Sequence, residues 1–420
     1  MNVSKYSKIS INLIIVLVVP FLILGPFLPD LIVSISVLFF LYHILKKNNF
    51  YYLNNKVFKI FLLFCIISTI CSLESKNISL SIQSSLFYFR IGVFSCLIWY
   101  LIDKDKNILI YFYYALVICF SLLVIDGFIQ YFTGVNIIGL KKSGVRISSF
   151  FGDEFIMGSY LSRLFPLLFA LFLIKQKKKY EVYFIGLLFV LVDILIFISG
   201  ERSAFFFLNV SSLFIILLIK QYQKFRLVTF VIAVFCIILI SFNSGIYSER
   251  MFKIPAQSMG IIKESKKKII FTEMHDSHFR TAYNMFKDHP VLGHGPKMFR
   301  VICKNQKYAV GVSPCSSHPH NFYIQLLAET GFVGFLFLLS SLIYIIYVSL
   351  RQFKSIIFKQ KRYLLDYQVC LLAGLLITVW PISANGNFFN NWLMITYSLP
   401  VGFYLQSVYS KKNKKRGFYL

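Results

Sequence analysis

Segments of about 20 mainly apolar residues, the length that a helix needs to cross a bilayer, recur along the chain with one long polar interruption. The 420 residues are 57% hydrophobic and 18% aromatic, and the mean hydropathy of +0.70 lies far above that of soluble domains. Backbone polar groups in lipid must be paired within their own segment, which favours helices. The sequence therefore predicts an all-α polytopic membrane protein.

Twelve transmembrane helices are predicted, nine before the polar stretch and three after it. Their approximate bounds are Ile9–Pro26, Leu31–Leu45, Val57–Ser72, Leu80–Ile102, Ile108–Phe132, Phe155–Ile174, Val182–Ile198, Ser203–Ile219, Leu227–Phe242, Asn321–Leu350, Tyr363–Ser383 and Trp392–Tyr409. Pro20 interrupts the first span. No small-residue cleavage site follows this span, so we expect it to be retained rather than removed as a signal peptide.

Lysine and arginine residues are distributed unevenly between alternate loops. One set of loops, with both chain ends, holds 25 of them, whereas the short loops of the other set hold Lys76, Lys141, Lys142, Arg146 and Arg202. Basic residues in short loops stay in the cytoplasm, so both termini are expected there. The net charge of +27 is then mainly a topology signal and an attraction to anionic membrane lipids, and nucleic acid is not an expected partner.

The predicted regions are residues 1–242, a bundle of nine helices; 243–319, a large basic periplasmic loop with short amphipathic helices; 320–410, three further helices; and 411–420, a basic cytoplasmic tail. Within the loop, one amphipathic helix is predicted from about Ser277 to Lys287, and Pro290 with a Gly293-x-Gly295 turn ends it.

Six of the eight cysteines fall inside predicted spans, where we interpret them as small buried hydrophobic residues. The other two, Cys303 and Cys315, lie in the loop on the oxidising side of the membrane. This compartment permits a disulfide between them, and the sequence leaves open whether it forms.

The tenth predicted span begins with two histidines, His318 and His320. Asn321 can cap the first turn, which places His320 at the positive end of the helix dipole and favours its neutral form. On a continuous helix, Gly331 and Gly334 share a face with His320 and form a groove that another helix or a lipid-like chain can approach. The alternative interpretation is a helix pair that packs through the glycines, with His320 merely at the interface.

Glu329 lies about half a turn from that stripe. A lone carboxylate in lipid costs at least ~2.5 kcal/mol, so Glu329 is expected to have a partner, which the sequence does not identify. His275-x-x-His278 has a spacing compatible with a metal site, but no third ligand is evident and no metal is expected. Four other charged residues in the spans are interpreted as hydrogen-bond partners rather than catalytic groups: Asp126, Asp193, Arg90 and Arg163.

Three arginines, Arg146, Arg202 and Arg280, map to the outer face beside predicted helix ends. A guanidinium group binds phosphate oxygens through two parallel hydrogen bonds. Each arginine alone is explained as a solvated loop residue. Together, beside a helix that begins with histidines, they suggest a site that binds a diphosphate.

These residues carry a resemblance to a known family. His320-Asn321, nine residues and then Gly331-x-x-Gly334 resemble the H-N-x9-G-x-x-G signature of the O-antigen ligase and O-antigen polymerase superfamily. Phe335 departs from the small residue or tyrosine that often follows. Other segments resemble further parts of the family pattern in the same order: Gly144–Leu161, Ser199–Phe205 and His278–Phe299. The resemblance covers about residues 140–340.

The resemblance implies a helical bundle of the GT-C type and a metal-independent, inverting glycosyltransferase that needs no cofactor. A glycan on undecaprenyl diphosphate is expected to move to an acceptor hydroxyl, on lipid A core or a similar molecule, at the periplasmic face of the bacterial inner membrane. The implied catalytic residues are His320, Arg280 and Arg202, and the implied substrate-binding residues are Arg146, His318, Asn321, Gly331 and Gly334.

The motifs leave two enzymatic alternatives open. A ligase transfers a finished glycan, whereas a polymerase extends a growing lipid-linked glycan, and both use the same signature. A transporter or flippase is the alternative from another class, but it predicts two related halves and polar residues at mid-membrane. The informative residues here gather on one outer face, which favours glycosyl transfer. The sugar, the linkage, the acceptor and the oligomeric state are not determined.

Overall fold

The computed structural model describes residues 5–175, 177–243, 245–258 and 271–410. Throughout these ranges the regular structure is helical, and the only extended pairings are two isolated bridges, Val135 with Lys141 and Ser143 with Arg146. The all-α fold class predicted from hydropathy is confirmed.

The helices in the described ranges follow one another along the chain. They are α1 (Lys5–Val16), α2 (Val18–Leu24), α3 (Phe27–Lys47), α4 (Lys56–Leu73), α5 (Ile78–Ser85), α6 (Phe89–Lys104), α7 (Asn107–Thr133), the 3-10 helix η1 (Ser149–Phe151), α8 (Met157–Ile174), α9 (Lys179–Ile198), α10 (Arg202–Leu218), α11 (Gln223–Asn243), α12 (Gly245–Ser248), the π-helix η2 (Glu249–Lys253), α13 (Ile254–Ser258), α14 (Glu273–Asp288), α15 (Phe299–Ile302), α16 (Phe322–Ile357), α17 (Asp366–Thr378) and α18 (Asn391–Tyr409).

Helices occupy all twelve segments that were predicted to span the membrane. In the part of the chain that the structure describes, eight helical segments are long and apolar enough to cross a bilayer. Three more apolar helices are shorter: Ile11–Leu24, Arg202–Leu218 and Asp366–Thr378. The chain is thus a multi-pass membrane protein, and the full count of twelve spans stays a prediction.

Three predicted spans are not continuous helices. The first breaks at Leu17, one residue before α2, because Pro20 in the next turn has no N–H to donate. The fourth divides into α5 and α6. The tenth, α16, is kinked at Gly331, whose φ of 63° and ψ of −166° lie outside the helical region.

Helix α8 lies at the centre of the bundle, where it packs against α7, α9, α10, α17 and α18. In its most apolar stretch 89% of the residues are buried, compared with 22% for α11 and 22% for α16. The poorly buried helices expose large apolar side chains, such as Phe235 at 60% and Ile343 at 58%. Side chains of this kind are stable in contact with lipid, which supports the membrane assignment.

Several charged side chains within the bundle have partners from other segments. Arg226 and Asp193 form a bidentate ion pair with N–O distances of 2.9 and 3.1 Å, and Arg90 pairs with Asp30 at 2.6 Å. Asp126 accepts hydrogen bonds from the 136–149 segment. The expectation that Asp126, Asp193 and Arg90 are internal partners is confirmed. Arg226 precedes the predicted span Leu227–Phe242, but the structure places it within α11 with its side chain completely buried.

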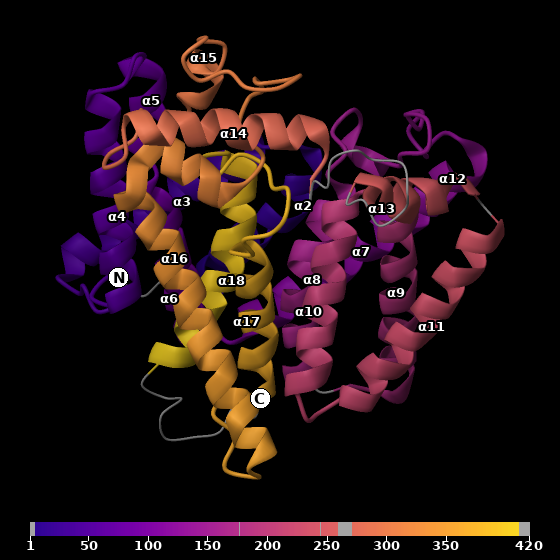
Figure 1. The fold of residues 1–420 in the computed structure, drawn as a ribbon. Helices are drawn as coiled ribbons and strands as arrows, with labels where there is room; N and C mark the ends of the chain where they lie inside the picture. The colour runs from indigo at the N-terminus through magenta and orange to yellow at the C-terminus, as the bar shows by residue number, and fades with distance from the viewer. Residues whose placement is uncertain (1–4, 176, 244, 259–270, 411–420) are drawn as a thin grey trace.

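The longer connections gather at one end of the bundle, which we call the loop end: residues 134–156, 199–202, 245–258, 271–321 and 379–390. Figure 1 shows α14 lying across this end, above the start of α16, with α12 and α13 to one side. Thr272 caps α14, so the helix begins four residues before the predicted Ser277. The candidate site lies here.

Candidate functional site

The start of α16 is held by the Asn321 side chain, as the sequence predicts. Its Oδ1 accepts hydrogen bonds from the N–H groups of Tyr323 (3.0 Å) and Ile324 (3.2 Å), which have no partner within the helix. Its Nδ2 donates to the carbonyl oxygens of Pro381 (2.8 Å) and Ser383 (3.2 Å). One side chain thus caps α16 and anchors the segment between α17 and α18.

His320, which precedes this cap, has a left-handed backbone with a φ of 58°. Such a conformation costs a non-glycine residue ~1–3 kcal/mol, so surrounding contacts must hold it. One of them is the hydrogen bond that the Asn385 N–H donates to the His320 carbonyl at 2.8 Å. In this turn the His320 ring centroid lies 5.4 Å from that of His278 and 4.1 Å from that of His318.

Four imidazoles form the histidine cluster: His275 and His278 from α14, and His318 and His320 from the chain just before α16. The His275 ring centroid lies 6.3 Å from His278 and 5.2 Å from His320. His278 is 1% exposed, and neither of its ring nitrogens has a hydrogen-bond partner of good geometry. The cluster joins the loop helix α14 to the start of α16.

Burial is the largest cause that lowers the pKa of each imidazole in the histidine cluster. The pKa of His318 falls to about 4 and that of His320 to about 3, and neighbouring imidazoles contribute to both shifts. Arg202, the first residue of α10, also lowers the pKa of His275. The cluster is therefore neutral near pH 7, the form in which an imidazole can accept a proton.

Three arginines from distant parts of the chain form the arginine cluster: Arg146, Arg202 and Arg250. Burial lowers the pKa of Arg146. The positive charges of Arg250 and Arg202 lower this pKa further, whereas the carboxyl group of Glu201 raises it. Arg250 belongs to η2 and donates from Nε to the Gly200 carbonyl at 3.1 Å. Gly200 has a φ of 71°, and a Cβ there would lie 2.7 Å from Arg250 Nε, so only glycine allows this approach.

Glu201 is buried next to the arginine cluster and caps α8. Its Oε1 accepts a hydrogen bond from Gly158 N (2.6 Å) and its Oε2 from Ser159 N (3.0 Å). Burial raises the pKa of Glu201 to about 7, although these N–H groups, Arg146 and Arg163 act in the opposite direction. Glu201 thus lies close enough to Arg146 and Arg163 for their positive charges to act on its carboxyl group.

Arg163 of α8 is 4% exposed and forms no ion pair with a described residue. Its Nη2 donates to Asn385 Oδ1 at 3.1 Å, and its guanidinium carbon lies 4.8 Å from the Phe207 ring and 4.9 Å from the Tyr397 ring. Asn385 in turn contacts His318, whose Nε2 lies 3.3 Å from the Asn385 carbonyl oxygen. Arg163 Nη1 and Asn385 Nδ2 are buried without a partner. Unpaired buried donors are costly unless a ligand satisfies them.

The geometry is that of a neutral base cluster beside fixed positive charge. Residues 186–339 match the family model described as O-antigen ligase. The chain carries an O-antigen ligase domain. A search of curated proteins finds no match. The domain indicates a membrane protein of the O-antigen ligase and polymerase type, which acts in surface glycan synthesis.

The matched O-antigen ligase domain includes the histidine cluster, Arg202 and Arg250. It also includes Arg280, which the structure does not bring into the arginine cluster. The Arg280 side chain is 61% exposed, and its Nε lies 2.9 Å from Asp276 Oδ2 one turn earlier on α14. A phosphate-binding role for Arg280 therefore requires the Asp276 pair to open.

The expected groove beneath His320 is filled by the domain's own atoms. A Cβ at Gly331 would lie 2.1 Å from the Val291 carbonyl oxygen, and Phe332 N donates to the Pro290 carbonyl at 2.8 Å. A Cβ at Gly334 would lie 2.0 Å from Thr330 Oγ1. The prediction of a straight helix with room for a second chain was wrong, because the 290–295 turn packs into the kink.

Glu329 has its partners, and they are not basic side chains. Its Oε1 accepts a hydrogen bond from Phe299 N at 3.1 Å, and its Oε2 accepts one from Gln325 Nε2 at 2.9 Å. Gln325 also bonds to Asn387 in the segment before α18. Glu329 thus connects α15, α16 and that segment, which explains a carboxyl group at a fully buried position.

Cys303 and Cys315 are joined by a disulfide, the pairing that the sequence left open, with a Cα–Cα distance of 5.2 Å. The disulfide closes a loop that runs from the end of α15 to the residues just before His318. It ties the segment that carries the second half of the histidine cluster to α15.

Several residues of this site were not expected from the sequence. Arg250 is one of many basic residues in its loop, and Asn385 follows a predicted span. A row of asparagines between two apolar segments, which includes Asn385, Asn387 and Asn390, was the available signal for a polar lining. Arg163 was interpreted only as an internal partner, because nothing in the sequence places it beside His318.

Proposed function

We propose that the protein transfers a glycan from undecaprenyl diphosphate to an acceptor hydroxyl at the loop end, which faces the periplasm from the bacterial inner membrane. The observation that carries the proposal is that the neutral histidine cluster lies near the arginine cluster. The charge of Arg202, in the arginine cluster, lowers the pKa of His275, in the histidine cluster. The O-antigen ligase domain supports the same class of reaction.

His320 is the proposed base. The acceptor hydroxyl gives its proton to a ring nitrogen of His320 as its oxygen forms a bond to the anomeric carbon of the donor glycan. The bond from that carbon to the diphosphate oxygen breaks, and its electron pair leaves with the diphosphate. Attack from the opposite side inverts the anomeric centre. The proton then passes from His320 to solvent or to the departing diphosphate.

The arginine cluster is the proposed binding site for the diphosphate. Negative charge grows on the leaving oxygen in the transition state, and guanidinium groups placed in advance stabilise it. Arg146 and Arg202 act with Arg250 in this proposal, so the positive charge comes from side chains rather than from a metal ion. Arg280 can join them if its ion pair with Asp276 exchanges for phosphate oxygens.

Arg163 and Asn385 are proposed as the inner wall of the site. Their unpaired donors, Arg163 Nη1 and Asn385 Nδ2, suit the oxygen atoms of a sugar or a phosphate. Asn385 also contacts both His318 and His320, so ligand binding at this wall would align the base.

The test uses the purified protein in nanodiscs, with an undecaprenyl diphosphate glycan and an acceptor, and measures transferred glycan by mass spectrometry. His320→Ala and Arg202→Ala should each lower turnover at least ~100-fold. Lys287→Ala, an exposed change on α14, should retain turnover. Wild-type turnover by a folded, membrane-inserted His320→Ala protein would remove His320 from the mechanism.

The acceptor distinguishes a ligase that modifies lipid A core from a polymerase that extends a lipid-linked glycan. Cells that lack the protein should accumulate full-length lipid-linked glycan and an unmodified core if it is the ligase. Core capped with a single repeat unit would instead assign the polymerase reaction. Mass analysis of both lipid fractions separates the two outcomes.

A further inference from the structure

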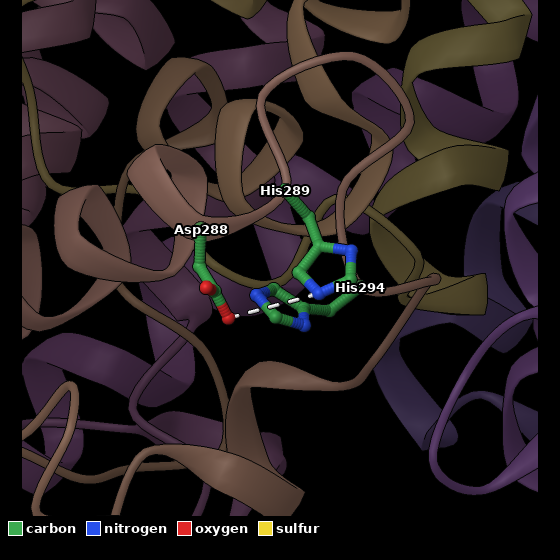
Figure 2. A group of neighbouring side chains, drawn as sticks. All are labelled: Asp288, His289 and His294. Carbon is green, nitrogen blue, oxygen red and sulfur yellow. Dashed lines mark ion pairs between the residues drawn. The ribbon is translucent and has the colours of Figure 1, made fainter.

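A second cluster of ligating side chains lies at the end of α14, apart from the histidine cluster. Asp288, His289 and His294 each offer one ligand atom, and these atoms lie within 4.8 Å of one another. Figure 2 shows the three side chains turned toward a common point, with the carboxylate on one side and the two imidazoles on the other. The ring centroids of His289 and His294 are 4.2 Å apart.

The tautomer of His294 is set by its surroundings. Its Nε2 lies 3.0 Å from the Met285 carbonyl oxygen, which can only accept a hydrogen bond, so Nε2 carries the proton. Nδ1 is then left with a free lone pair. Burial lowers the pKa of His294, which keeps the ring neutral. A histidine that donates one N–H to a carbonyl and presents the other nitrogen is the usual arrangement of a metal ligand.

Asp288 supplies the negative charge. Hydrogen bonds from Lys307 and Tyr308 lower its pKa to about 2, so it is ionised at physiological pH. Its Oδ2 faces His289, whose Nε2 lies 3.6 Å away. The Lys307 ammonium pairs with the other oxygen, Oδ1, from a side chain that is 59% exposed. The Tyr308 hydroxyl donates a hydrogen bond to Oδ2 at 2.5 Å, which uses one of the two lone pairs of that oxygen. The exposed Lys307 side chain can move if a second cation arrives.

We propose that Asp288, His289 and His294 bind a divalent transition-metal ion of the zinc class. Two imidazoles and one carboxylate are a ligand set that Zn²⁺ accepts, with ligand bonds of about 2.0–2.2 Å and water in the remaining position. The ligand atoms must close in by roughly 1 to 2 Å to reach that geometry. His289 is free to make this movement, since its side chain is 53% exposed.

The consequence of metal binding is structural. Asp288 and His289 end α14, whereas His294 belongs to the 290–295 turn that packs into the α16 kink. A bound ion would clamp α14, which carries His275 and His278, to this turn. The proposal does not depend on the glycosyl transfer reaction.

The test uses the whole protein in detergent, purified without a histidine tag and treated with EDTA, and measures Zn²⁺ binding by calorimetry. One ion per chain should bind, and the ion should raise the unfolding temperature. His289→Ala and His294→Ala should each weaken binding at least ~10-fold. Lys287→Ala is the matched control on the same turn of α14 and should bind as the wild type does.

His289 is exposed, so we expect His289→Ala to leave the fold intact. The His289→Ala protein therefore still tests the proposal if the His294→Ala protein does not fold. Co²⁺ in place of Zn²⁺ should give the visible absorption of a four-coordinate site in the wild type, and His289→Ala should abolish it. No Zn²⁺ binding by the wild type, or equal binding by the His289→Ala protein, would overturn the proposal.

Discussion

At the scale of single residues, His320 and Arg163 show how burial changes what a polar side chain can do. Burial opposes protonation of His320, and the other imidazoles of the histidine cluster add to the effect. Arg163 keeps a buried guanidinium group with one donor unpaired. Asn385 lies between the two residues and bonds to both. The base and the inner wall therefore act as one unit in the proposed reaction.

The pH dependence of transfer tests the state of His320. A base works in its neutral form, and a pKa lowered to about 3 keeps His320 neutral well below its ordinary value of 6.5. His320 itself should therefore cause no loss of rate between about pH 5 and 8, and should lower the rate only as the pH approaches its lowered pKa. Rates at saturating donor and acceptor, measured in a Glu201→Gln protein, isolate this effect, because the pKa of Glu201 is raised to about 7. A midpoint near 6.5 in that protein would show that His320 titrates as an exposed imidazole.

Arg163→Gln tests whether the buried charge matters beyond its hydrogen bond to Asn385. Glutamine can still donate to Asn385 Oδ1 but carries no charge and only one donor nitrogen. We expect kcat/KM to fall about 10- to 100-fold, with retained thermal stability. Arg163→Lys should recover part of the loss because it restores the charge. Full activity of Arg163→Gln would reduce Arg163 to a structural support for Asn385.

At the scale of elements, the kink in α16 decides where the loop packs. Gly331 lies against the backbone of residues 291–292, and Gly293 lies against the backbone of residues 329–331. His294 N and Gly295 N donate to the carbonyl oxygens of Ala328 and Glu329 in α16. These bonds replace the intrahelical pairing that the kink removes. The loop is therefore joined to α16 through its main chain, directly after the end of α14.

Gly331→Ala should damage this junction. The new Cβ would lie 2.1 Å from the Val291 carbonyl oxygen, and a φ of 63° is unfavourable for alanine. The backbone conformation alone costs ~1–3 kcal/mol, and the displaced 290–292 segment adds to it. Thermal unfolding in detergent measures the loss. Gly245→Ala is the control, since a Cβ there meets nothing within 4 Å. Equal unfolding temperatures for the two variants would contradict the packing described for Gly331.

At the scale of the whole molecule, residues that are far apart in the sequence form the site at one end of the bundle. Arg146, Arg163, Arg202 and Arg250 come from the first 250 residues, and Asn385 comes from the segment between α17 and α18. The bond between Arg163 and Asn385 joins residues 222 positions apart. The central helix α8 carries Arg163 and holds these parts together, so the bundle must be complete before the site exists.

The two ends of the bundle are predicted to face opposite sides of the membrane. The bias of basic residues predicts that the loop end faces the periplasm and that the opposite ends of the helices face the cytoplasm. Cysteines introduced as Lys142→Cys, at the loop end, and Lys220→Cys, after α10, should react with an impermeant maleimide from opposite sides. Labelling of right-side-out and inside-out vesicles measures this. Labelling of both positions from the same side would reverse or refute the topology.

Short-range patterns in the sequence were sufficient to predict the helices, the membrane class and the family, because hydropathy and motif spacing depend on neighbouring residues. They also placed His318, His320 and Asn321 at the start of α16, where a helix cap is a local interaction. The same local reasoning failed at Gly331 and Gly334, because it assumed a straight helix and could not include the 290–295 turn.

The tertiary structure decided which polar groups meet. Only the folded bundle brings Arg250 beside Arg202 and Asn385 beside Arg163. It also brings the two histidines of α14 into contact with the two histidines that precede α16. It also turned Arg280 toward Asp276 instead of the arginine cluster. Contacts of this kind depend on packing between segments far apart in the chain, and neither the composition nor the spacing of any one segment contains that information.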